Sequence, residues 1–355
     1  MSTSVECYPK RNINIELVRC VAIIFVVMEH VLSELIMYPT GEPKWYFGIF
    51  IWTMIKVNVP LFLIVTAFLS FKESLIPHEF FIKKLKRVII PIIFWGTFYS
   101  LTFTSSDARF LSVVLNIING TGMYHLYFMY WFIGFSFFFP FINYLFFKSE
   151  KSFYFYFFVL IVACSLLPVI NVAFNTGINA FGAAGIAYFG FLVFYSFVPK
   201  LSDKIKSYIC KERRCILFFL LYIASCVFTF LAAVFLHNEK QVQLASVISG
   251  GSFFVFISSV MFYCFIMNIN LSKIPGTLKK IIVFWGGNSF GVYLVHPFVL
   301  SIILNKIHQS KFSYVFIDDG VYRAAYFVAT VFVVYAVSLL ISVTLSKIKY
   351  LNKVV

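Results

Sequence analysis

Arg19 and His30 are the residues of this sequence best suited to chemistry, because both are ionisable and both lie in the first hydrophobic segment. They are eleven residues apart, so on an α-helix their side chains fall within about 20° of one another and about 16 Å apart along the axis. Ionisable groups are costly inside a membrane and usually mark a pathway or a site. Histidine gains and loses a proton near neutral pH, which suits a general base. The pair therefore predicts a reaction site built into a membrane helix.

Acidic side chains accompany both residues. Glu16 lies three residues before Arg19, at the spacing of a helical ion pair, and Glu34 lies one turn beyond His30, where it could orient the imidazole ring. Glu29 is adjacent to His30 but points about 100° away, so it is the weaker candidate. Two simpler interpretations stay open. Arg19 could extend to the inner headgroups, and His30 could be a passive hydrogen-bonding group between helices.

The composition predicts an all-α polytopic membrane protein. Of the 355 residues, 61% are hydrophobic and 12% are charged, whereas a soluble domain has about 25% charged residues. Apolar stretches of about 20 residues recur along the chain, which is the length needed to cross a bilayer. We predict one membrane domain, residues 1–355, with ten spans. These are roughly 15–37, 47–71, 84–106, 124–147, 152–171, 180–199, 214–236, 246–268, 281–304 and 321–346.

The distribution of Lys and Arg predicts the orientation. Placing both termini in the cytoplasm puts 21 basic residues on that side and six on the other, as the positive-inside rule requires. The net charge of +15 is therefore mostly topological, and contacts with membrane lipids are the simplest role for most basic turns. The charge is split among short turns, which argues against nucleic acid as a partner. The sequence has neither an HExxH pattern nor Cys/His ligand spacing, so no metal is expected.

Five motifs in order resemble those of acyltransferase family 3, a family of membrane-bound acyltransferases. The first is the Glu16–Arg19–His30 pattern itself. The others follow at the family's spacing. They are Pro60-Leu-Phe-Leu-Ile-Val-Thr-Ala-Phe-Leu, Phe81-Ile-Lys-Lys-Leu-Lys-Arg-Val-Ile-Ile-Pro91, Tyr124-His-Leu-Tyr-Phe128 and Asn288-Ser-Phe-Gly-Val-Tyr-Leu-Val-His296. The chain departs from the family where Thr66-Ala67 replaces Ser-Gly, Lys84 replaces an arginine and Tyr127 replaces a tryptophan.

The resemblance implies an O-acetyltransferase of the bacterial cytoplasmic (inner) membrane. Acetyl-CoA would be the donor from the cytoplasm, and the acceptor would be a surface polysaccharide or its lipid-linked precursor. Under this reading His30 is the general base, oriented by Glu34, and Arg19 with Glu16 organises the donor channel. Lys84 and Arg87, in a basic segment that suits phosphate, would bind the donor. Further candidates are His125, Tyr127, Tyr293 and His296.

Other interpretations of these residues stay open. Lys84 and Arg87 could be positive-inside anchors, and His125 could be an interfacial polar residue. His296 followed by Pro297 could mark a packed kink, and Tyr293 could be interfacial rather than an oxyanion donor. The alternative functions are transfer of succinyl or another short acyl group, a small-molecule or peptidoglycan acceptor, and a transporter or flippase for a polysaccharide precursor. The sequence does not indicate an oligomeric state.

Overall fold

The computed structural model describes residues 12–35, 42–70, 75–103, 110–148, 211–240, 252–309 and 320–355, and the single positions 155, 159, 162, 166, 170 and 248. All regular structure in these residues is helical. The elements are α1 (Ile13–Leu35), α2 (Pro43–Ile55), α3 (Asn58–Ser70), α4 (Pro77–Phe103), α5 (Phe110–Asn119), η1 (Tyr124–Leu126), α6 (Tyr127–Lys148), α9 (Lys211–Lys240), α11 (Phe253–Asn268), α12 (Gly276–Gly287), α13 (Ser289–Gln309), α15 (Gly320–Lys347) and η2 (Leu351–Lys353).

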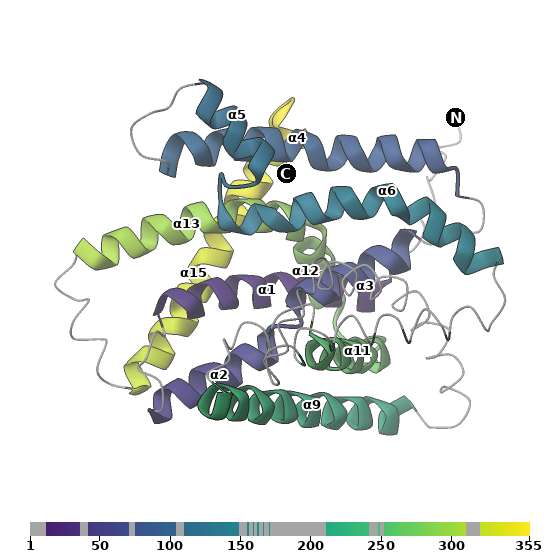
Figure 1. Ribbon diagram of the computed structural model, residues 1–355, viewed down its shortest axis with the longest axis vertical. Helices are drawn as coiled ribbons and strands as arrows, with labels where there is room; N and C mark the ends of the chain where they lie inside the picture. Colours follow the sequence, from purple (N-terminus) through teal and green to yellow (C-terminus); the bar gives the residue numbers. More distant parts are fainter. Residues whose placement is uncertain are drawn as a thin grey trace.

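Helix α1 lies at the centre of the molecule. In Figure 1 it runs between α4 and α6 on one side and α9 and α11 on the other. It packs against α2, α3, α11, α12, α13 and α15. One hydrophobic cluster joins its first half to α3, α9 and α11, and a second joins its other half to α4, α13 and α15. A residue on α1 can therefore meet side chains from most of the described chain.

Four helical stretches are long and apolar enough to cross a membrane within the described residues. They are Trp45–Ser70, Arg213–His237, Ser289–Lys306 and Ala324–Lys347. Helix α1 has 23 residues and is also long enough, but it carries four charged residues, which lower its hydropathy. These stretches support a multi-pass membrane protein. The full set of ten spans stays a prediction, since 152–171 and 180–199 lie outside the described residues apart from single positions.

Two predicted spans are each divided into two helices. The span 47–71 is broken at Lys56 and Val57, between α2 and α3. Pro60 has no N–H to donate to the carbonyl of Lys56, so a continuous helix would leave that group without its helical partner. The span 281–304 is broken at Asn288, after two glycines that weaken the end of α12. The predicted loop 107–123 contains a further helix, α5.

Helix α12 approaches α1 unusually closely at Gly286. A Cβ atom at this position would lie 2.7 Å from the backbone oxygen of Glu16 and 2.5 Å from its carboxylate. Only glycine therefore allows this approach. One turn earlier, the Cys20 thiol lies 3.2 Å from the carbonyl oxygen of Ile282. This contact places α12 beside Arg19, next to the charged part of α1.

Candidate active site

Three histidines from different elements meet at one end of α1. The ring of His30 stacks on that of His296 from α13, with 5.2 Å between centroids and 26° between planes. The His125 ring from η1 lies 5.6 Å from that of His296. We call His30, His125 and His296 the histidine cluster. The three motifs that contribute these residues are far apart in the sequence, and the tertiary structure brings them together.

The dipeptide His296-Pro297 fixes the orientation of the His296 ring. Proline has no N–H, so the carbonyl of Tyr293, four residues earlier, loses its helical donor. The Nδ1 atom of His296 lies 2.8 Å from this oxygen and 3.2 Å from that of Val292. Carbonyl oxygens only accept, so Nδ1 must carry the proton in these contacts. In the neutral ring, Nε2 is then left as an acceptor.

Several ring nitrogens of the cluster have no hydrogen-bond partner in the described part of the chain. Nε2 of His296 and both ring nitrogens of His125 are buried without a hydrogen bond to any residue that the structure describes. Buried polar atoms are seldom left unsatisfied, and those that are need an explanation such as a ligand or water. His125 and His296 are almost fully buried, whereas His30 is half-buried. His30 is therefore the member of the cluster that a substrate can reach most readily.

Tyrosines hold the cluster in place. Tyr293 is buried and its hydroxyl donates to the carbonyl oxygen of His125, so it fixes η1 against α13. Tyr99 from α4 lies 5.2 Å from the His125 ring and donates a hydrogen bond of 2.7 Å to the carbonyl of Leu294. Gly120 has a φ of +69°, in the left-handed region that glycine tolerates, in the turn that leads from α5 to His125. The burial of Tyr293 does not fit the interfacial alternative.

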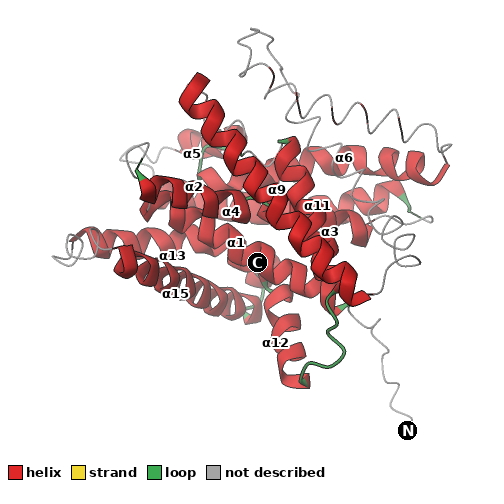
Figure 2. Ribbon diagram, turned by 90° about the horizontal axis from the view of Figure 1, so that it is seen from below, coloured by secondary structure: helices red, strands yellow, loops and turns green. Residues whose placement is uncertain are grey.

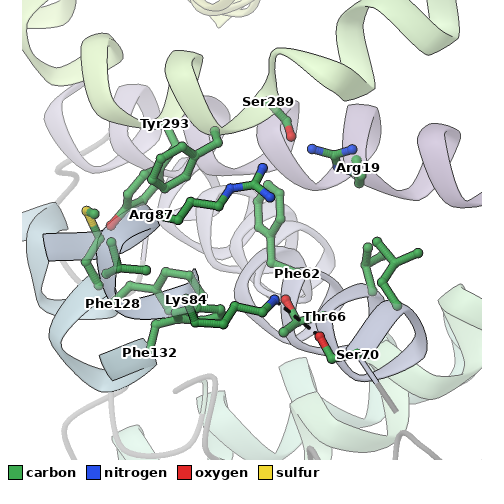
Figure 3. A pocket seen from close by; sticks show the side chains of 15 residues that line it. Arg19, Phe62, Thr66, Ser70, Lys84, Arg87, Phe128, Phe132, Ser289 and Tyr293 are labelled. Atoms are coloured by element: carbon green, nitrogen blue, oxygen red, sulfur yellow. Dashed lines mark hydrogen bonds between the residues drawn. The ribbon is translucent and has the colours of Figure 1, made fainter. Parts of the chain in front are cut away.

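A cavity of about 220 Å³ lies along α1 towards its first turns (Figure 3). We call it the cation cavity, because three basic side chains line it: Arg19, Lys84 and Arg87. The rest of its wall is largely apolar and aromatic, with contributions from α3, α6 and α13. Such a cavity can hold a ligand that combines an anionic group with an apolar or uncharged portion.

Two of the three basic side chains that line this cavity, Arg19 and Lys84, have defined contacts. Arg19 forms an ion pair with Glu16, with 3.2 Å between Nη1 and Oε2, at the i, i+3 spacing. Lys84 donates a hydrogen bond of 3.2 Å to the hydroxyl of Ser70 and lies over the ring of Phe132, 5.7 Å from its centroid. Arg87 lies one turn after Lys84 on α4 and is exposed. Lys83 and Lys86 on the same helix are also exposed and are not among the cavity-lining residues.

Tyr293 separates the cation cavity from the histidine cluster. It lines the cavity, and its ring lies 5.4 Å from that of His125 and 6.1 Å from that of His296. The two sites are therefore neighbours along α1 that share one wall. One candidate, Tyr127, is exposed at the start of α6 and lines neither site. The backbone of Glu34 lies in α1, but its side chain is not among those that the structure describes, so its role stays a prediction.

The structure adds a polar contact that the sequence did not predict. Glu29 forms an ion pair with Lys56 at the break between α2 and α3. Its second oxygen accepts a hydrogen bond of 2.5 Å from the amide of Asn58. The signal in the sequence was a lysine and a glutamate within separate apolar segments, since such charges usually pair. Among the described residues, no group of three or more His, Cys, Asp or Glu side chains is placed to hold a metal ion.

Comparison with known proteins identifies the family. A model of a protein family with the description 'Acyltransferase domain' matches residues 12–345, which is nearly the whole chain. Neither a curated protein nor a solved structure matches the sequence. The matched range includes α1, the cation cavity and the histidine cluster, and it confirms the resemblance carried by the five motifs. The chain belongs to acyltransferase family 3.

Proposed function

We propose that this protein is an O-acetyltransferase that moves an acetyl group from acetyl-CoA to a hydroxyl group of a surface polysaccharide or its lipid-linked precursor. Family membership supports acyl transfer in a membrane. The observation that carries the rest is the position of the histidine cluster, which shares Tyr293 with a cavity lined by cations. Such a pair of sites suits a reaction between an anionic donor and a neutral hydroxyl.

In the proposed reaction, His30 acts as general base. It removes the proton of the acceptor hydroxyl as the oxygen attacks the thioester carbonyl of the donor. The tetrahedral intermediate then collapses, the C–S bond breaks, and the thiolate of coenzyme A leaves and takes up a proton. The products are the acetyl ester and coenzyme A. His30 suits this role because it is the member of the cluster that keeps accessible surface.

The other two histidines support the proposed base. The buried His296 ring stacks on His30, and its own orientation is fixed by the carbonyl freed by Pro297. A ring that cannot rotate offers His30 a rigid surface, which favours one reactive orientation. Nε2 of His296 and one ring nitrogen of a neutral His125 can accept hydrogen bonds from hydroxyl groups of a sugar, and the other nitrogen of His125 can donate one.

In this proposal the donor binds at the cation cavity. Arg19, Lys84 and Arg87 would contact the phosphates or the polar arm of acetyl-CoA, and the aromatic wall would enclose its apolar parts. The donor would enter from the cytoplasm and the acceptor from the opposite side of the bacterial inner membrane. This orientation follows from the positive-inside bias of the sequence.

The test is a transfer assay in membranes that contain the wild-type protein or the His30→Ala variant, supplied with radiolabelled acetyl-CoA. We expect label in the glycan fraction with the wild type and none with the folded variant. Equal label with both proteins would exclude His30 as the base. Labelled succinyl-CoA in a parallel reaction distinguishes another acyl group, and flux of a glycan precursor without acyl-CoA would favour a transporter.

A further inference from the structure

A second, shallower pocket adjoins the cation cavity, and we call it the α12 pocket. It has a volume of about 670 Å³ and shares Arg19 and Arg87 with the cavity. Its other wall is one face of α12, where residues four apart stand in line. These residues are Lys279, Lys280, Val283, Phe284 and Gly287, followed by Asn288. The pocket is thus an open extension of the cavity towards α12, which projects at one edge of the helices in Figure 2.

The charge of this pocket is strongly positive. Lys279, Lys280, Arg19 and Arg87 line it, and none of the described residues that line it is acidic. Of these four, Arg19 is paired with Glu16, and Lys279 donates a hydrogen bond of 2.9 Å to the carbonyl of Ser272. Cations that face one pocket repel one another, and a bound polyanion relieves that repulsion. The aromatic ring of Phe284 adds a flat apolar surface on which a base could stack.

A buried polar atom lies where the pocket meets the cavity. Ser289 begins α13, lines the cavity beside Arg19 (Figure 3) and is almost fully buried. Its hydroxyl has no hydrogen-bond partner among the residues that the structure describes. An unsatisfied hydroxyl that faces a cavity is typical of a ligand contact. The start of α13 also directs the positive end of its helix dipole to this point.

We infer that the α12 pocket binds the phosphorylated nucleotide end of the acyl-CoA donor, with Lys279 and Lys280 at its 3′-phosphate and Ser289 at the start of the pantetheine arm. This inference rests on the proposed function and deepens it. The donor then lies along the charged half of α1, with its nucleotide against α12, its arm beside Arg19 and Ser289, and its thioester towards Tyr293. The contact that allows this is the close approach of α12 to α1 at Gly286.

The experiment measures binding of coenzyme A and 3′-dephospho-coenzyme A by calorimetry, with the purified full chain in lipid nanodiscs. We expect the wild type to bind coenzyme A about tenfold more tightly than 3′-dephospho-coenzyme A, since a charge-assisted contact to the 3′-phosphate contributes on this scale. The Lys279→Gln/Lys280→Gln variant should bind both ligands with the affinity that the wild type has for 3′-dephospho-coenzyme A. Lys280→Gln alone tests the same point at an exposed side chain, where misfolding is not expected. Lys273→Gln is the matched control, because Lys273 is exposed before the same helix and does not line the pocket.

Ser289→Ala separates the two parts of the site. It should lower the affinity for coenzyme A and for 3′-dephospho-coenzyme A by the same factor, about threefold, because both carry the pantetheine arm. This inference would be overturned if the lysine variants prefer coenzyme A over 3′-dephospho-coenzyme A as strongly as the wild type does. If His30-dependent transfer proceeds in the same preparations, the proposed function would still stand. A wild type that binds neither ligand would overturn both.

Discussion

The two ends of α1 accommodate polar groups in different ways. The end near Arg19 carries full charges, which are exposed or paired: Arg19 with Glu16, and Lys84 with Ser70. The end near His30 carries the ion pair of Glu29 with Lys56, and places imidazole rings deep in the protein, where two of the three histidines are almost fully buried. Charge is tolerated where a partner or an opening is near, while titratable rings can be buried without the same cost. One helix thus places a group of cations and a histidine cluster about 16 Å apart.

The comparison predicts that the two ends contribute to different kinetic quantities. Variants at the histidine cluster should lower the rate of transfer with little effect on donor affinity. Variants at the cation cavity should lower the affinity for the donor and have less effect on the rate of transfer once the donor is bound. The largest expected effect is at His30.

His30→Ala should lower the rate of acetyl transfer about a thousandfold, which is within the range that general base catalysis contributes. Donor binding should stay within about twofold, because His30 does not line the cation cavity. The measurements are transfer of radiolabel and a donor titration with the same preparation. His78→Ala is the control, since His78 is exposed at the start of α4. A comparable loss of donor binding would contradict the division of roles.

Lys56→Met should destabilise the histidine end, because it leaves Glu29 without its cation in a mostly buried position. For a pair that is about one-fifth exposed we expect a loss of about 2 kcal/mol, less than for a fully buried pair. The readout is thermal unfolding of the purified protein. The Glu29→Gln/Lys56→Met variant should recover part of the loss, and a double variant as unstable as the sum of the two single ones would show that the groups do not interact.

Arg87→Ala should raise the Michaelis constant for acetyl-CoA about tenfold and leave the maximal rate nearly unchanged, since it removes a binding contact and no reacting group. Initial rates over a range of donor concentrations provide the test. Lys86→Ala is a matched control on the neighbouring residue, which is exposed and lies outside the cavity wall. An equal effect of both substitutions would favour general anchoring by positive charge over a donor contact.

Pro297→Ala should have the smallest effect and is specific for the orientation of the His296 ring. The new N–H can donate to the carbonyl of Tyr293, which would compete with Nδ1 of His296. We expect the maximal rate to fall about fivefold while the Michaelis constant for the donor is unchanged, because a ring free to rotate supports His30 less well. A fall in thermal stability without a change in rate would assign Pro297 a packing role alone.

The sequence predicted much of the central helix and little of its surroundings. The range 15–37 agrees closely with α1, and the i, i+3 spacing of Glu16 and Arg19 is that of the observed ion pair. The breaks at Lys56 and Asn288 were missed, because hydropathy averages over a whole segment and is insensitive to one lost hydrogen bond. Helical geometry alone makes Glu29 the weaker acidic neighbour of His30 and does not predict its partner Lys56, since the pair joins residues 27 positions apart.

What the sequence determined by itself is local and compositional. Its apolar runs predict membrane helices, its motifs identify the family, and a separation of eleven residues aligns Arg19 with His30 because helical geometry is fixed by hydrogen bonds between near neighbours. Only the tertiary structure decided that His30, His125 and His296 form one cluster and that α12 stands beside Arg19. Those contacts depend on how helices from distant segments pack, which follows from the shape of whole surfaces and from single close approaches such as Gly286 against Glu16.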